Sequence, residues 1–304
     1  MKKVINHRFG VEIELNTFDY PSNKSDDNSE PIGSRHAAHV VKETLQENVE
    51  VTTWHTTINS NRRLVKPDSS CGFEICSPVL KGRQGLKSLV SVINSLKNDG
   101  RFNADSKCSF HVHFELPSRD VGFISSLIVN WIKCELFFFL LIPDYRKQSK
   151  YCQLMGLSDL FPNNSQLDKN IIFNKVSDYK FYSLSLYHFK KSNRNTVEFR
   201  LMDNRACLDG KLVENWIILL NRFINKSNNN YVFNKEGLLE KPFVWLDFKD
   251  VFDFLDLYKE KELIEFIKKR IKSFAKNDSF FSLSLLKKIF GCYLNESIIF
   301  LENI

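Results

Sequence analysis

The sequence predicts an α+β fold with a largely antiparallel sheet and packed helices. Runs rich in β-branched and aromatic residues, bounded by turn residues, mark short strands, and apolar residues at spacings of three and four mark helices. These segments follow one another without the regular strand–helix–strand rhythm that is typical of a parallel sheet. A chain of 304 residues, 43% of them hydrophobic, is long enough to bury a large core.

The expected elements fill the chain in an irregular order. Strand-like runs cover residues 4–15, 49–58, 72–77, 108–116, 181–187 and 196–202. Helical spacing covers residues 34–47, 86–96, 121–142 and 212–223. Residues 225–230, rich in Asn and Ser, are typical of a linker. We therefore expect a catalytic domain over residues 1–230 and a helical C-terminal extension over residues 231–304.

One apolar stretch, Val121–Ile142, approaches the length needed to span a membrane. It carries Asn130, Lys133 and Glu135 in its middle, which favours a buried helix and no membrane partner. The seven cysteines are an odd number without a C-x-x-C pair, and no signal-peptide pattern opens the sequence. Reduced thiols and a cytoplasmic location are therefore expected.

The charge of the chain is unevenly distributed. The net charge is +7, whereas residues 231–304 hold 12 basic and 12 acidic residues, so the excess lies entirely before residue 231. A mild basic excess beside the motifs favours an anionic small ligand such as a nucleotide. It does not indicate a nucleic-acid partner, for which a stronger basic patch is typical.

Two carboxylates alternate with apolar residues in the first strand-like run. Successive side chains of a strand point to opposite faces, so Glu12 and Glu14 would share one face while the apolar residues around them face the core. Alone, such a pair is more typical of a solvated sheet face than of a functional site. The interpretation therefore depends on the other strands.

Two later runs carry the same alternation. His111 and His113 would share a face of one strand, and Glu198 and Arg200 a face of another. Buried charges are costly unless they are paired or bound to a metal, so three such strands indicate one shared, ligand-filled cleft. With Glu74 as a further carboxylate, the set suits Mg²⁺ or Mn²⁺ ions that clamp a triphosphate.

Motifs in several segments are specific when they are taken together and in order. They are residues 9–14 (FGVEIE), 68–82 (DSSCGFEICSPVLKG), 108–113 (CSFHVH), 143–146 with 151–152 (PDYR and YC) and 195–200 (NTVEFR). This series resembles the motifs of the amidoligase family, which belongs to the glutamine-synthetase-like carboxylate–amine ligases. The resemblance covers about residues 4–225 and implies a glutamine-synthetase-like catalytic domain.

The resemblance also implies a reaction. A substrate carboxylate attacks the γ-phosphorus of ATP to give an acyl phosphate, and an amine then displaces phosphate to leave an amide or isopeptide bond. ATP and Mg²⁺ or Mn²⁺ are the implied cofactors, and a carboxylate and an amine donor are the implied substrates. The implied metal ligands are Glu12, Glu14, Glu74, His111 and Glu198.

The remaining implied site residues act on the nucleotide. His113 would contact the nucleotide or a metal, while Arg200 and Arg146 would stabilise the transferring phosphoryl group. These three are the implied catalytic and cofactor-binding residues. An acyl phosphate must be shielded from water, and residues 22–33 and 159–174 have the composition of lid loops.

One position departs from the family pattern: Ser109 stands where the histidine motif has glycine. If that glycine lets the strand approach a phosphate closely, Ser109 alters the nucleotide geometry or weakens binding. A catalytically inactive nucleotide-binding relative is therefore one alternative, and a small-molecule phosphotransferase on the same fold is another. A zinc hydrolase is a third, although the sequence lacks a helical H-E-x-x-H motif.

Overall fold

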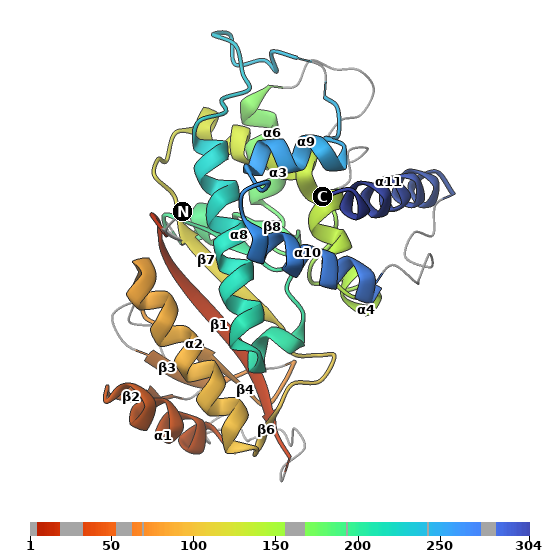
Figure 1. Cartoon of the computed structure of the whole chain (residues 1–304). Coiled ribbons are helices and arrows are strands. Elements are labelled where there is room, and N and C mark those ends of the chain that lie inside the picture. The colour runs from red at the N-terminus through yellow and green to blue at the C-terminus, as the bar shows by residue number, and fades with distance from the viewer. Residues whose placement is uncertain are drawn as a thin grey trace. The chain divides into compact units, whose positions relative to one another are not determined.

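The computed structural model divides the chain into two compact units (Figure 1). The first unit consists of Met1–Glu115 and Met202–Ile218, and the second of Leu116–Leu201 and Leu219–Ile304. The residues that the structure describes are 5–18, 33–52, 63–68, 70–155, 168–192, 194–241, 243–274 and 284–304.

The first unit is built on a sheet whose central strand is β1, the long red strand of Figure 1. Its strands are β1 (Arg8–Thr17), β2 (Val49–Val51), β3 (Arg63–Pro67), β4 (Phe73–Cys76), β5 (Leu80–Lys81), β6 (Phe102–Asn103) and β7 (Phe110–Glu115). The order is β2-β3-β4-β1-β7, with β5 and β6 pairing with the two ends of β1. All of these pairs are antiparallel except β2 with β3, so the predicted largely antiparallel sheet is confirmed.

Amphipathic helices accompany this sheet. They are α1 (Ser34–Leu45), α2 (Gly82–Asp99), the 3-10 helix η1 (Asn204–Leu208) and the first part of α8 (Gly210–Asn228). In α2, Leu86, Leu89, Ile93 and Leu96 recur at helical spacing and are buried, as predicted. The helix ends at Gly100, whose φ of 78° is the left-handed conformation that glycine adopts without strain.

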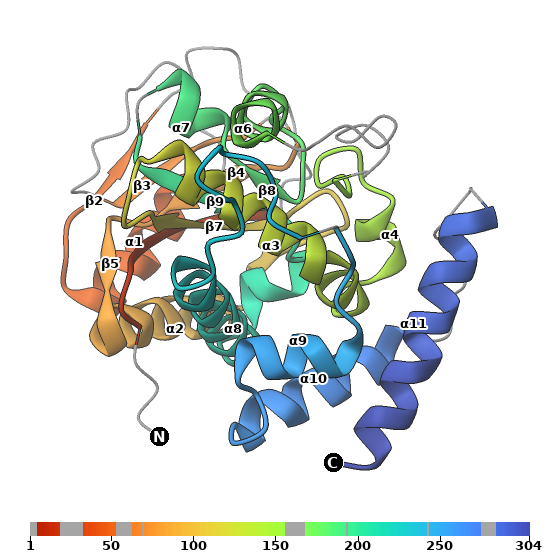
Figure 2. The ribbon, with the colours of Figure 1, turned by 90° about the horizontal axis from the view of Figure 1, so that it is seen from above.

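The second unit is mostly helical. Its strands β8 (Leu184–Ser185) and β9 (Thr196–Phe199) form an antiparallel pair. Its helices are α3 (Val121–Leu140), α4 (Asp144–Lys147), α6 (Lys169–Ser177), α7 (Tyr187–Lys191), α9 (Phe248–Leu255), α10 (Lys261–Phe274) and α11 (Ser284–Glu302), together with the end of α8. α9 and α11 pack against one another and against α3 (Figure 2).

α3 is the core helix of the second unit, as the sequence predicts. It is long and apolar enough to cross a membrane by composition, but 94% of its most apolar window is buried inside the protein. The Asp120 side chain caps its first turn by accepting a hydrogen bond from Phe123 N. A helix that is apolar on all sides needs cover on all sides, and α6, α9, α10 and α11 contact it.

Two expectations from the sequence are corrected by the structure. The run 181–187 contains only the short strand β8, because helix α7 already begins at Tyr187. The expected linker at 225–230 is wrong over 225–228, since α8 continues to Asn228 with Ser227 buried in its last turn. Burial in the packed unit outweighs the weak helix propensity of Asn and Ser there. The proposed domain boundary after residue 230 stays a prediction.

Candidate functional site

The strand register of the first unit brings the predicted side chains onto one face of its sheet. Glu14 lies opposite Glu74 on β4, and Glu12 lies opposite His111 on β7. His113, two residues further along β7, shares the face of His111. Directly opposite residues of antiparallel strands point to the same side, so all five share this face. We call these five residues the acidic face.

Glu12 lies between the two histidines of the acidic face. His111 Nδ1 lies 3.1 Å from Glu12 Oε2, and His113 Nε2 lies 3.2 Å from Glu12 Oε1. Burial alone would raise the pKa of Glu12, but the charges and hydrogen bonds of His113 and His111 hold it well below its usual range. Glu12 is therefore an ionised carboxylate at neutral pH.

Glu74 is buried beside a cation that the sequence interpretation missed. Lys66 Nζ lies 3.0 Å from Glu74 Oε1, and the Cys76 thiol donates to the same oxygen at 2.8 Å. Burial and the charge of Glu12 raise the pKa of Glu74 to about 7, although Lys66 opposes this rise. Residues 63–67 are not among the expected strands, so the sequence does not indicate that Lys66 lies opposite Glu74.

Ser109 fixes Glu14. The backbone N–H and the hydroxyl of Ser109 both donate to Glu14 Oε2, each at 2.7 Å. The same hydroxyl oxygen lies 3.0 Å from His111 Nε2, so it bridges the carboxylate and the imidazole. A glycine at this position would supply only the backbone N–H. The departure from the family pattern therefore adds a contact to two residues of the acidic face.

The donor set of the acidic face fits a hard divalent cation. Oxygens of Glu12 and Glu74 and the sulfur of Cys76 lie within 4.8 Å of one another, close enough for a single ion to reach both carboxylates. Burial raises the pKa of Cys76 well above its usual range, which keeps the sulfur a neutral thiol and a poor ligand. Carboxylate oxygens then dominate, as Mg²⁺ and Mn²⁺ prefer.

The other predicted site residues belong to the second unit. Glu198 is buried on β9, and Arg200 Nη1 donates to its Oε1. Arg200 Nε also donates to the carbonyl of Tyr151 at 3.0 Å. Arg146 on α4 is buried, and its guanidinium donates to the carbonyls of Arg200 and Leu201. Arg146 thus holds the end of the segment that carries Arg200, while its contact with a phosphate stays a prediction.

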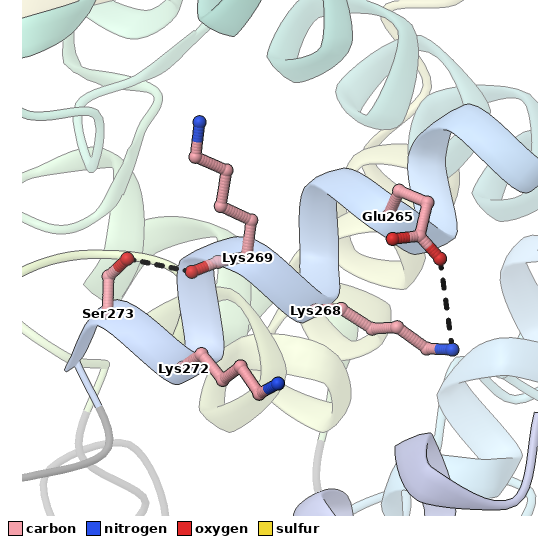
Figure 3. A pocket seen from close by; sticks show the side chains of 5 residues that line it. All are labelled: Glu265, Lys268, Lys269, Lys272 and Ser273. Atoms are coloured by element: carbon pink, nitrogen blue, oxygen red, sulfur yellow. Dashed lines mark hydrogen bonds and ion pairs between the residues drawn. The ribbon is translucent and has the colours of Figure 1, made fainter.

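A surface depression of about 410 Å³ lies along α10 and contains none of these residues (Figure 3). Its lining residues are Glu265, Lys268, Lys269, Lys272 and Ser273. Figure 3 shows Lys268 turned toward Glu265, with 3.8 Å between their charged atoms, while Lys269 and Lys272 point apart. A candidate catalytic site needs polar groups that converge, and these diverge.

Comparisons with known proteins agree with the motif series. A family model described as "Putative amidoligase enzyme" matches residues 5–224. No curated protein matches the chain. Two solved structures are similar at 11% sequence identity. For a novel glutamine synthase homolog the TM-score is 0.45, with 95% of this chain and 71% of that chain covered.

The second structure is a bifunctional glutathione synthetase from Pasteurella multocida, with a TM-score of 0.42 and 98% of this chain covered. The chain covers 52% of that protein, about half its length. With TM-scores below 0.5, neither likeness shows a shared fold. The family match is different in kind, because it spans most of the chain and contains every predicted site residue. The chain therefore belongs to the amidoligase family over residues 5–224, and its kind of function is that of a carboxylate–amine ligase.

Proposed function

We propose that this protein is an ATP-dependent ligase that joins a carboxylate to an amine through an acyl phosphate. The observation that carries the proposal is the acidic face, where three carboxylates and two histidines occupy neighbouring strands within the family match. Such a concentration of oxygen ligands suits the Mg²⁺ or Mn²⁺ ions that accompany a triphosphate.

The proposed reaction has two steps. One oxygen of the substrate carboxylate bonds to the γ-phosphorus of ATP, the bond from that phosphorus to the bridging oxygen breaks, and ADP leaves. The amine nitrogen then bonds to the acyl carbon, phosphate leaves with the carbon–oxygen electron pair, and the amine loses a proton. The product is an amide, or an isopeptide if the amine belongs to a lysine side chain. Bound divalent cations would neutralise the charge of the triphosphate throughout.

The side chains have distinct proposed roles. Glu12, Glu14, Glu74, His111 and Glu198 would hold the cations. Glu12 is suited to this role because its low pKa keeps it ionised. The charged guanidinium of Arg200 would stabilise the transferring phosphoryl group, with Arg146 supporting it and His113 contacting the nucleotide.

The setting of this reaction is also a proposal. The cysteines of the chain are free thiols, and those other than Cys292 are buried. Free thiols persist in a reducing compartment, so we place the ligase in the cytoplasm. Its partners would be small carboxylates and amines or a protein amine, and neither nucleic acid nor a membrane.

The test is ADP release from Mg-ATP, screened over carboxylates with and without amines. A ligase releases ADP to completion only when both substrates are present, and Glu12→Gln abolishes release. Asp99→Asn is the matched control, because that carboxylate of the first unit pairs with Arg101 and His36 at the end of α2. ADP release that ignores the amine would identify the phosphotransferase instead, and zinc-dependent hydrolysis without ATP would contradict the proposal.

A further inference from the structure

Glu135 is a buried carboxyl group that the proposed reaction does not use. It lies in the middle of α3 with 1% of its surface exposed. Both of its oxygens accept from the backbone N–H of Met155, each at 3.1 Å. The hydroxyl of Ser183 donates to Glu135 Oε1. Every one of these bonds reaches out of α3 to another segment of the second unit.

The contact with Ser183 continues to a tryptophan. Trp131 Nε1 donates to Ser183 Oγ at 2.9 Å, so the Ser183 hydroxyl accepts from Trp131 and donates to Glu135. Burial raises the pKa of Glu135 to about 8, although its hydrogen bonds lower it. The group is therefore mostly neutral at pH 7, which reduces the cost of burying it. Its hydrogen bonds are directional and specify where its partners lie.

Those partners are the two segments that hold Arg200. The backbone N–H of Arg200 donates to the carbonyl of Ser183 at 2.9 Å, and its Nε donates to the carbonyl of Tyr151 at 3.0 Å. Ser183 N also donates to the carbonyl of Gln153 at 2.8 Å, which joins the two segments to each other. Glu135 binds one segment at Ser183 and the other at Met155.

We infer that Glu135 is a positioning residue for Arg200. It holds Ser183 and residues 151–155 in register, and through them it sets the backbone and the Nε of Arg200. The inference rests on the proposed function only in assigning Arg200 to the phosphoryl group. Glu135 itself touches neither substrate nor nucleotide in this account.

The alternative is that Glu135 only stabilises the packing of α3 and has no effect on Arg200. Asn130, another buried polar residue of α3, distinguishes the two roles. It donates to the backbone carbonyl of Asn230 and accepts from the Asn230 side-chain amide, each at 3.0 Å. Within the described part of the chain, Asn130 makes no hydrogen bond to Ser183 or to residues 151–155. Asn130→Ala therefore removes a buried polar group from α3 while leaving the support of Arg200 in place.

The experiment compares Glu135→Leu, Glu135→Gln, Ser183→Ala and Asn130→Ala in the full chain. The first readout needs no nucleotide and has two parts. One is the NMR signal of Arg200 Nε–H, which is assigned by its absence in Arg200→Lys. The other is the rate of hydrogen exchange at the backbone amide of Arg200. We expect Glu135→Leu and Ser183→Ala to shift the signal and speed exchange about tenfold, which corresponds to the loss of one hydrogen bond from the local stability. Glu135→Gln keeps an acceptor for the Ser183 hydroxyl, so it should retain most of the protection of the Arg200 amide from exchange. Asn130→Ala should change neither the Arg200 Nε–H signal nor the exchange rate.

The second readout is the Kd for Mg-ATP. Ser183→Ala should weaken binding about tenfold in the wild-type background and have no further effect in Arg200→Ala, because coupled residues are not additive. Unchanged Arg200 signals in both Ser183→Ala and a folded Glu135→Leu would overturn the inference, whatever the nucleotide result. Changed signals in a protein that does not bind Mg-ATP would support the positioning role and refute the proposed function.

Discussion

Ser109 donates two hydrogen bonds to a single oxygen of Glu14, one from its backbone and one from its hydroxyl. That oxygen is therefore occupied on the side of β7, and the same hydroxyl contacts His111. We expect Ser109→Gly, which restores the glycine of the family motif, to remove the hydroxyl contact from both side chains and leave them more available to a cation. The Kd for Mg-ATP in calorimetry should fall about threefold to tenfold, the usual net worth of one hydrogen bond.

Ser109→Ala is the control for that prediction. It removes the hydroxyl but keeps a Cβ on the strand, so it separates the hydrogen bond from the close approach that glycine allows. Equal effects of the two variants would assign the change to the hydroxyl. Weaker binding of Mg-ATP in both variants would show that the hydroxyl supports the site and that our expectation is wrong.

Glu74 should make metal binding depend on pH. Its pKa of about 7 means that a proton competes with the cation below pH 7 and leaves above it. The affinity for Mn²⁺, followed by electron paramagnetic resonance, should therefore rise from pH 6 to pH 8. In Glu74→Gln the affinity should be lower and the rise much flatter. A slope equally steep in Glu74→Gln would place the titrating group elsewhere.

Glu135 should make folding stability depend on pH in the opposite sense. Its folded-state pKa of about 8 lies above the usual 4.5. The contribution of Glu135 to the free energy of unfolding is therefore fully present below pH 4.5 and is lost as the pH rises through 8. The free energy of unfolding of wild type relative to Glu135→Gln should fall between pH 5 and pH 9, by on the order of 4 kcal/mol at most. Urea unfolding at each pH measures this difference, and a constant difference would contradict the assigned pKa.

Removal of residues 231–304 should prevent stable folding. Phe137 of α3 packs its ring against Phe248 and Phe252 of α9, with centroids 5.4 and 6.3 Å apart. Arg270 Nε donates to the carbonyl of Leu141, just past the end of α3, at 2.7 Å. Truncation would expose this apolar surface, and we expect a chain of residues 1–230 to aggregate. A soluble, cooperatively unfolding truncation would instead support an independent domain ending at residue 230.

Alternation in the sequence predicts which residues of a single strand share a face, because a strand with a buried apolar side fixes which residues lie on the other side. Glu12 and Glu14 follow from this rule, as do His111 and His113. The registers that place Glu12 opposite His111 and Glu14 opposite Glu74 could not be read from single strands. They arise from pairing between segments that are far apart in the chain.

Other features depend on tertiary packing. Helix α8 continues to Asn228 although Asn and Ser have weak helix propensity. The proximity of Lys66 to Glu74 depends on the pairing of β3 with β4, which places the two residues opposite one another. Glu135 gave a sequence signal, as a charge within an apolar helix, but its partners Met155 and Ser183 are distant in sequence. Residues 22–32 and 159–167, which the sequence predicts to be parts of lid loops, lie outside the described residues. Asp168 instead caps α6, so residues 169–174 are helical.

Calorimetric titration with ATP, in the presence and absence of Mg²⁺, tests the central claim most directly. It compares wild type with Glu198→Ala, and Asp99→Asn serves as the control. We predict magnesium-dependent binding at micromolar strength that is lost in Glu198→Ala and kept in Asp99→Asn. Mg-ATP affinity that survives in Glu198→Ala would contradict the assigned metal ligands, and no binding by the wild-type protein would contradict the ligase itself.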